Sequence, residues 1–225
     1  MTTLIITIIP SILIFFYFFL SDKFKEPKST IALVFALGIL ICFPAGHLNT
    51  FIIENFGTTD FRKKLTYSFL GPAWIEEILK FLVLYTVVLR RNEFNERMDG
   101  IVYGVVVSLG FATYENYDYV FRIAETWDIA PSQMAIWRSY TAVPMHGLNG
   151  CIMGFFFGMY AFTADKKFLI LSLLIPFMLH GLYNFFAFPF NFFIVVGMLI
   201  YAVKLNSNLK KLQSIKTNEA EKLKI

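Results

Sequence analysis

Residues 2–20 read TTLIITIIPSILIFFYFFL, a stretch without a charged side chain that is long enough to cross a lipid bilayer. A helix of about 20 apolar residues spans the hydrocarbon core, which is about 30 Å thick. Further apolar stretches of similar length follow along the chain. We expect seven membrane-spanning segments, at about 2–20, 30–48, 65–89, 99–122, 135–163, 168–187 and 189–204.

The composition of the whole chain favours the same interpretation. Of the 225 residues, 57% are hydrophobic and only 16% are charged. Ordinary soluble domains carry about 25% charged residues, and a soluble fold of this size could not bury so much apolar surface. The composition therefore excludes a soluble domain, a disordered chain and a disulfide scaffold. It predicts an all-α, polytopic integral membrane helix bundle.

The basic residues predict how this bundle is oriented. With the N-terminus outside, the segments on the inner side hold fourteen lysines and arginines, and those on the outer side hold four. Such an excess is typical of cytoplasmic loops. We expect a multi-pass protein of the cell membrane with a transmembrane domain over 1–204 and a basic cytoplasmic tail over 205–225, a frayed helix on the membrane surface. The net charge of +4 then reports topology and contact with the lipid bilayer, with no nucleic acid as partner.

Ionisable side chains inside the expected spans are candidates for function, because burying them in a membrane is costly. Residues 71–81 of the third span read GPAWIEEILKF. Glu76 and Glu77 point about 100° apart on a helix, so only one of them can face a central site. Lys80 lies within reach of both. An internal ion pair would explain one carboxylate and leave the other unexplained.

The fourth and fifth spans each carry a further candidate. Residues 111–116 read FATYEN and contain Glu115 and Asn116, although Glu115 could also be a carboxylate that reaches the membrane surface. Residues 144–150 read PMHGLNG and contain His146, which could instead be a hydrogen-bonded core residue. The glycines at 150, 154 and 158 that follow predict a close helix-packing face.

The sixth span supplies the last candidate pair. Residues 176–184 read PFMLHGLYN, so His180 and Asn184 lie one helical turn apart and can face the same point. The alternative is a hydrogen-bonding pair between helices. Another histidine, His47, lies at the outer end of the second span and is interpreted as an interfacial residue.

The expected depths of these residues favour a single site. Glu76 and His146 lie about 16 Å below the outer ends of their helices, His180 about 12 Å and Glu115 about 6 Å. Three of the four motifs also follow a proline, which frees backbone groups and opens polar cavities. These are Pro72, Pro144 and Pro176.

Carboxylates and histidines together suit either acid–base activation of water or metal binding. No serine lies in a GxSxG context, and Cys151 lies at an awkward helical angle from His146. The chain has no HExxH motif, so we expect no cofactor, with a metal left open. Both cysteines, Cys42 and Cys151, lie in apolar runs and are interpreted as packing residues.

The ordered series of motifs resembles the PrsW family of glutamic intramembrane proteases, which is related to CAAX prenyl proteases and bacteriocin-processing enzymes. It consists of Glu76-Glu77-x-x-Lys80, Phe111-x-x-x-Glu115-Asn116, the His146 segment and His180-x-x-x-Asn184. The resemblance covers a catalytic core of about 65–187. It implies that Glu76 is the general base, that Glu77 supports it, and that His180 and Asn184 form an oxyanion pocket. Lys80 and Asn116 would support these groups.

The resemblance also implies a substrate and a cellular role. The expected reaction is site-1 cleavage of a single-span, membrane-anchored anti-sigma factor on its extracytoplasmic side, in an envelope stress response. The prenyl-protease pattern has Arg one residue beyond the position of Lys80 and His in place of Glu115. These departures point to the PrsW branch and leave open whether Glu115 or His146 shares the water with Glu76.

Two alternatives remain at the level of sequence. One is a CAAX-type or peptide-processing, metal-dependent membrane protease. The other is a proton-coupled transporter or sensor without protease activity, in which the same carboxylates would relay protons. Transporters commonly have inverted repeats, and the sequence has no such symmetry.

Overall fold

The computed structural model describes residues 2–56 and 59–222, and within them it contains helices and no strand. This confirms the predicted fold class. The helices are α1 (Thr2–Ser21), α2 (Lys28–Phe56), α3 (Asp60–Leu65), the π-helical η1 (Thr66–Ala73), α4 (Trp74–Thr86), the 3₁₀ turn η2 (Val88–Arg90), α5 (Arg97–Asp118), the π-helical η3 (Tyr119–Ile123), α6 (Ala124–Thr126), α7 (Pro131–Tyr140), α8 (Ala142–Thr163), α9 (Lys166–Phe185) and α10 (Phe190–Lys222).

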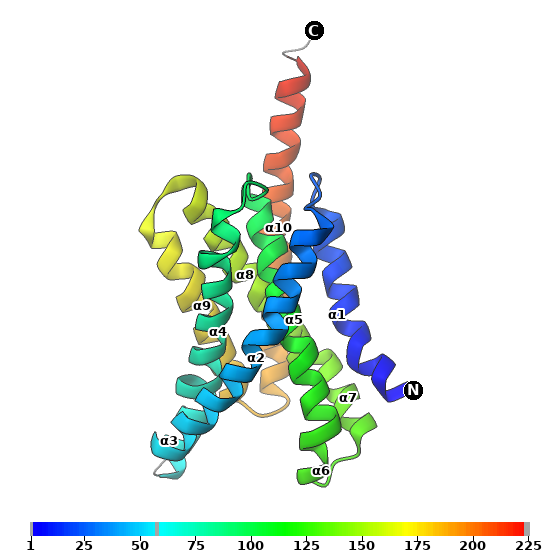
Figure 1. Cartoon of the computed structure of the whole chain (residues 1–225), viewed down its shortest axis with the longest axis vertical. Helices are drawn as coiled ribbons and strands as arrows, with labels where there is room; N and C mark the ends of the chain where they lie inside the picture. The colour runs from blue at the N-terminus through cyan, green and yellow to red at the C-terminus, as the bar shows by residue number, and fades with distance from the viewer. Residues whose placement is uncertain (1, 57–58, 223–225) are drawn as a thin grey trace.

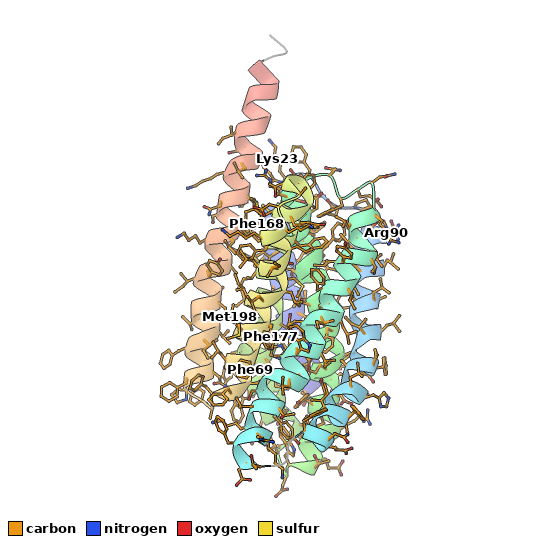
Figure 2. All side chains as sticks on the ribbon, turned by 90° about the vertical axis from the view of Figure 1, so that its left-hand side faces the viewer. Lys23, Phe69, Arg90, Phe168, Phe177 and Met198 are labelled. Atoms are coloured by element: carbon orange, nitrogen blue, oxygen red, sulfur yellow. The ribbon has the colours of Figure 1, made fainter. Side chains whose placement is uncertain are left out.

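The long helices run up and down the same axis and form one bundle (Figure 1). The N-terminus lies at the end of the bundle that carries α3 and α6, and the C-terminus extends beyond the opposite end. Lys23 and Arg90 lie near the C-terminal end, whereas Phe69 lies toward the other end (Figure 2). We call these the basic end and the N-terminal end.

Helices α5 and α8 form the centre of the bundle and pack more extensively against each other than any other pair. Glycines on both helices let their backbones touch. A Cβ atom on Gly154 would lie 1.9 Å from the carbonyl oxygen of Gly100, and one on Gly104 would lie 2.3 Å from that of Gly150. The predicted glycine face on the fifth span is therefore confirmed as a packing surface, and its partner is α5.

Four of the helices in the described residues are long and apolar enough to span a membrane by length and composition: α1, α2, α9 and the part of α10 up to Ile215. Helices α5 and α8 carry the polar motifs and are almost wholly buried among their neighbours. A multi-pass membrane bundle follows from these features, and the count of seven crossings remains a prediction.

The predicted fifth span, 135–163, is wrong as a single helix, because α7 ends at Tyr140 and α8 begins at Ala142. Thr141 between them has a non-helical backbone, with φ −121° and ψ −80°. Pro144 explains the break, since proline has no N–H to donate to the carbonyl of residue 140 and its ring clashes with that carbonyl in a continuous helix.

The last predicted span, 189–204, and the tail that was expected to be a frayed helix belong to one helix in the described residues. Helix α10 continues without interruption to Lys222 and projects past the basic end of the bundle, along its own axis (Figure 1). No proline or glycine follows Gly197, so nothing in the chain stops the helix near residue 204. The secondary structure therefore does not change at residue 204, where the span was expected to end and the tail to begin.

A π-helical segment and a glycine contact bring the third and sixth predicted spans together. The segment before α4 is π-helical and contains Pro72, and π-helical turns are frequent at functional sites. Gly181 of α9 lies against Phe69 of this segment, where an added Cβ would come within 2.1 Å of the ring. Phe69 also packs edge-on against Phe177 at 5.9 Å (Figure 2). This close approach places the polar residues of α9 next to those of α4.

Candidate active site

The two adjacent carboxylates of α4 are buried and have different surroundings. Oε1 of Glu77 lies 2.8 Å from Nζ of Lys80, whereas Oε2 of Glu76 lies 4.0 Å from the same nitrogen. Oε1 of Glu76 accepts a hydrogen bond from Asn49 on α2 at 3.2 Å, and its Oε2 has no hydrogen-bond partner. Glu77 is therefore the member bound to the lysine, and Glu76 keeps an oxygen available for chemistry.

Both histidines join this group from neighbouring helices. Nδ1 of His180 on α9 lies 2.8 Å from Oε1 of Glu77. Nδ1 of His146 on α8 lies 2.9 Å from Nζ of Lys80, and the two imidazole rings meet edge to face at 5.0 Å. Motifs that are separated by up to about a hundred residues thus converge on one lysine and one carboxylate.

The hydrogen-bond partners assign the tautomers of these rings. A lysine ammonium can only donate, so Nδ1 of His146 accepts from Lys80, and Nε2 carries the hydrogen that it donates to Oε2 of Glu115 at 3.1 Å. Because Lys80 also donates to Oε1 of Glu77, that oxygen is an acceptor, and Nδ1–H of His180 donates to it. A neutral His180 then presents the lone pair of Nε2.

Glu115 has a second partner, Arg138, which was not among the predicted site residues. Nη2 of Arg138 on α7 donates to Oε2 of Glu115 at 2.6 Å, and Nε donates to Oδ1 of Asn116 at 2.8 Å. The guanidinium also lies over the ring of Tyr119, 4.0 Å from its centroid. A charged residue inside an expected span was the signal that could have identified Arg138.

These groups border a cavity of about 640 Å³. Its wall contains Glu76, Glu115, His146, His180 and Asn184 of the predicted residues, together with Asn49, Arg138 and Tyr183. Glu77 and Lys80 lie behind the wall and reach the cavity only through His180 and His146. The prediction that only one of the adjacent glutamates can face a central site agrees with this arrangement, and the one that does is Glu76.

The remaining predicted residues lie at the edges. Asn116 is fully buried, binds Arg138, and donates to the backbone carbonyl of Thr7 at 2.8 Å, so it holds α1 and α7 to α5. Asn184 is exposed at the rim of the cavity. His47, which was interpreted as interfacial, is also exposed and borders the same cavity. Asn49 was not predicted, since a lone asparagine near the end of a span gives no distinctive signal.

The same cluster fits a metal ion in ligand type and spacing. Glu76, His146 and His180 each offer a ligand atom, and the three atoms lie within 4.8 Å of one another. Two histidines and a glutamate form a donor set that zinc uses in proteases. The unpartnered Oε2 of Glu76 is the kind of atom that a cation would satisfy. A zinc ion held by these three residues would acidify a bound water and polarise a carbonyl.

With the fold and the geometry in view, comparison with known proteins identifies relatives. The model of the PrsW family intramembrane metalloproteases matches residues 26–206. Protease PrsW of Bacillus subtilis is 39% identical over 183 residues, which cover 79% of each chain. Protease PrsW of Geobacillus kaustophilus is 36% identical over 178 residues, 78% of this chain and 75% of that one.

A more distant relative covers still more of the chain. Protease PrsW of Clostridioides difficile is 29% identical over 216 residues, 93% of this chain and 89% of that protein. No solved structure matches. The matched residues include all four motifs on α4, α5, α8 and α9. The chain therefore belongs to the PrsW family of intramembrane proteases and is a multi-pass membrane peptidase.

Proposed function

We propose that this protease hydrolyses a peptide bond with a water molecule activated by Glu76. The observation that carries the proposal is the position of Oε2 of Glu76, which has no hydrogen-bond partner and belongs to a side chain in the wall of the cavity. A carboxylate in this position can take a proton from a bound water. Glu77 cannot do so directly, because it lies behind the wall and is bound to Lys80 and His180.

His180 is the group best placed to hold the water beside Glu76. Its Nδ1–H is fixed by Glu77, so the lone pair of Nε2 can accept a hydrogen bond from water. The ligand atoms of Glu76 and His180 lie within 4.8 Å of each other. One water that makes two hydrogen bonds of about 2.8 Å can bridge such a gap.

The reaction then follows from these positions. Glu76 takes a proton from the bound water while the water oxygen bonds to the scissile carbonyl carbon. The carbonyl oxygen then becomes an oxyanion. The side-chain amide of Asn184, which borders the cavity one turn after His180, supplies a donor for that oxyanion. The C–N bond breaks as Glu76 returns the proton to the leaving nitrogen. The reaction consumes one water molecule, and Glu76 is again a carboxylate at its end.

A metal-dependent version of the same reaction is the second candidate, because Glu76, His146 and His180 fit a metal ion. What favours the glutamate route is the state of His146. Its two ring nitrogens are both engaged, one with Lys80 and the other with Glu115. Either Lys80 would have to leave Nδ1 or Glu115 would have to leave Nε2 before His146 could serve as a ligand, whereas the glutamate route needs no such change.

We also propose that the substrate is a single-span membrane protein cut on the extracytoplasmic side, and that it is an anti-sigma factor whose loss starts a stress response. The basis for the side is charge: the basic end carries Lys23 and Arg90, and basic residues collect in the cytoplasm. The cavity wall includes residues at the other end, such as Tyr67 and Arg122. A cavity open at that end would admit a segment just outside the membrane.

The test is to profile new N-terminal peptides of membrane proteins in cells that express wild type, Glu76→Gln or Glu125→Gln at equal levels. Glu125 is an exposed carboxylate on α6 outside the cavity wall, so its variant is the matched control. We expect N-termini from the outer side of single-span proteins with wild type and Glu125→Gln, and none of them with Glu76→Gln. Cleavage by a folded Glu76→Gln at the wild-type rate would refute the role of Glu76. New N-termini on the inner side would refute the proposed orientation.

A further inference from the structure

A second group of acidic side chains lies at the basic end of the bundle, around the start of α5, whereas Glu115 of the cavity wall lies near the other end of that helix. Asp22 and Glu26 belong to the connection between α1 and α2, and Glu96 and Asp99 belong to the start of α5. Ligand oxygens of Asp22, Glu96 and Asp99 lie within 4.8 Å of one another. Asp22 is 2% exposed and Asp99 is 0% exposed. We call these four residues the acidic cluster.

The hydrogen bonds inside the protein satisfy only part of this cluster. Oδ2 of Asp99 accepts from the backbone amides of Asn95 and Glu96, each at 2.8 Å. Oδ1 of Asp22 accepts from the amide of Phe24 at 3.1 Å and from Nε2 of Gln213 at 2.7 Å. The other oxygens, Oδ2 of Asp22 and Oδ1 of Asp99, are buried without a hydrogen-bond partner. Two orphan carboxylate oxygens thus occur in one buried cluster.

Three of the four carboxyl groups lack an ion pair with a lysine or arginine in the part of the chain that the structure describes. These are the carboxyl groups of Asp22, Glu26 and Asp99. The ammonium of Lys25 turns to the backbone carbonyls of Phe19 and Asp22 instead. Glu26 is bound by the hydroxyl of Tyr103. Buried carboxylates are ordinarily paired or coordinate a metal.

We infer that the acidic cluster binds one hard divalent cation, Mg²⁺ or Ca²⁺, through Asp22, Glu96 and Asp99. Both ions take carboxylate oxygens at about 2.0–2.6 Å, so the ligand atoms of one ion lie no more than about 5 Å apart. The spacing of 4.8 Å or less meets this condition. The three ligand residues include no histidine or cysteine, which distinguishes this cluster from the donor set at the cavity.

Such a site would fasten the end of α10 to the rest of the bundle. Gln213 of α10 donates to Asp22 and to Oε1 of Glu96, so the helix already contacts two of the ligands. The side chains of Glu96 and Asp99 also form the capping box of α5. The cation would therefore join the α1–α2 connection, the start of α5 and the extended α10, and its place is independent of the proposed catalytic reaction.

The inference can be tested by titrating the purified full-length protein with Mn²⁺ and measuring free Mn²⁺ by electron paramagnetic resonance. We expect a bound Mn²⁺ that Mg²⁺ or Ca²⁺ displaces. The isosteric double variant Asp22→Asn/Asp99→Asn should weaken this binding by more than about 100-fold, since the loss of outer-shell partners alone costs about 10- to 100-fold. Glu93→Gln, a change in the same region outside the ligand set, should bind like wild type.

The decisive comparison is with Glu76→Gln, a variant in the wall of the cavity. Binding that persists in Glu76→Gln and is lost in Asp22→Asn/Asp99→Asn supports the inference. No binding to wild type, unchanged binding to the double variant, or loss of all binding in Glu76→Gln would each overturn it. If the double variant does not fold, Asp22→Asn and Glu96→Gln are titrated singly, and unchanged affinity in both overturns the inference.

Discussion

Nδ1 of His180 lies 2.8 Å from Oε1 of Glu77, the same oxygen that receives Nζ of Lys80 at 2.8 Å. This contact joins α9 to α4 behind the wall of the cavity. It gives the two adjacent glutamates separate tasks. Glu77 orients a histidine, and Glu76 faces the space where a substrate would bind.

Replacing each glutamate by glutamine should therefore have different effects on catalysis. Glu76→Gln should lower kcat by about 10²–10⁴-fold, because it removes the proposed base. Glu77→Gln should lower it by about 10–100-fold, as expected for a group that acts through another. Steady-state cleavage of a peptide spanning an identified cut site would measure both. Equal losses in two folded variants would contradict the division of tasks.

Lys80→Met should destabilise the protein by about 3–5 kcal/mol, because it leaves Glu77 as an unpaired buried charge. Lys80 is 0% exposed and also lies 4.4 Å from the ring centroid of Phe111. Thermal unfolding in detergent would measure the change, with the exposed Lys63→Met on α3 as control. A melting temperature equal to that of the control would show that the buried network needs no lysine.

Arg138→Lys should lower activity by about tenfold with little change in folding, because lysine keeps the charge but cannot bridge two acceptors. The guanidinium now holds Glu115 and Asn116 at the same time. The control is Arg62→Lys on α3, because Arg62 is exposed and should tolerate the change. Wild-type activity in Arg138→Lys would mean that the fork geometry does not matter for the position of Glu115.

Gly154→Ala should destabilise the contact between α5 and α8 by about 1–3 kcal/mol through overpacking. The new methyl group would meet the backbone carbonyl of Gly100, which has no side chain to move aside. Gly197→Ala on α10 is the matched control, because a Cβ there meets nothing within 4 Å. Parallel unfolding of both variants measures the difference, and equal stability would contradict the packing argument.

Removal of transition metals should leave cleavage intact if Glu76 acts without a metal. Activity would be followed after treatment with 1,10-phenanthroline in a buffer that contains Mg²⁺, so that the acidic cluster remains supplied with a hard cation. Loss of activity that returns on addition of Zn²⁺ would favour the metal-dependent route. A lower melting temperature in EDTA that Mg²⁺ restores, with cleavage unchanged, would instead report on the acidic cluster.

Much of the architecture followed from sequence because it depends on local composition. Long apolar runs predicted a helical membrane protein, and glycines spaced four apart predicted the packing face at Gly154. The break at Thr141 was missed because the apolar pattern continues through it, although Pro144 marked its place. The tail after residue 204 was expected to be helical, but hydropathy could not show that it continues the last span as one helix, because hydropathy reports where lipid ends and says little about where a helix ends.

The sequence by itself determined which polar residues occupy the membrane and on which helices they lie, because each motif is local to one helix. Only the tertiary structure decided their partners. The bond between His180 and Glu77 and the bond between Arg138 and Glu115 depend on how helices pack across the bundle. The meeting of Asp22 with Glu96 and Asp99 likewise depends on two segments that are distant in the chain. Contacts of a few ångströms between such elements are set by the shapes of packed side chains, and no spacing along one helix encodes them.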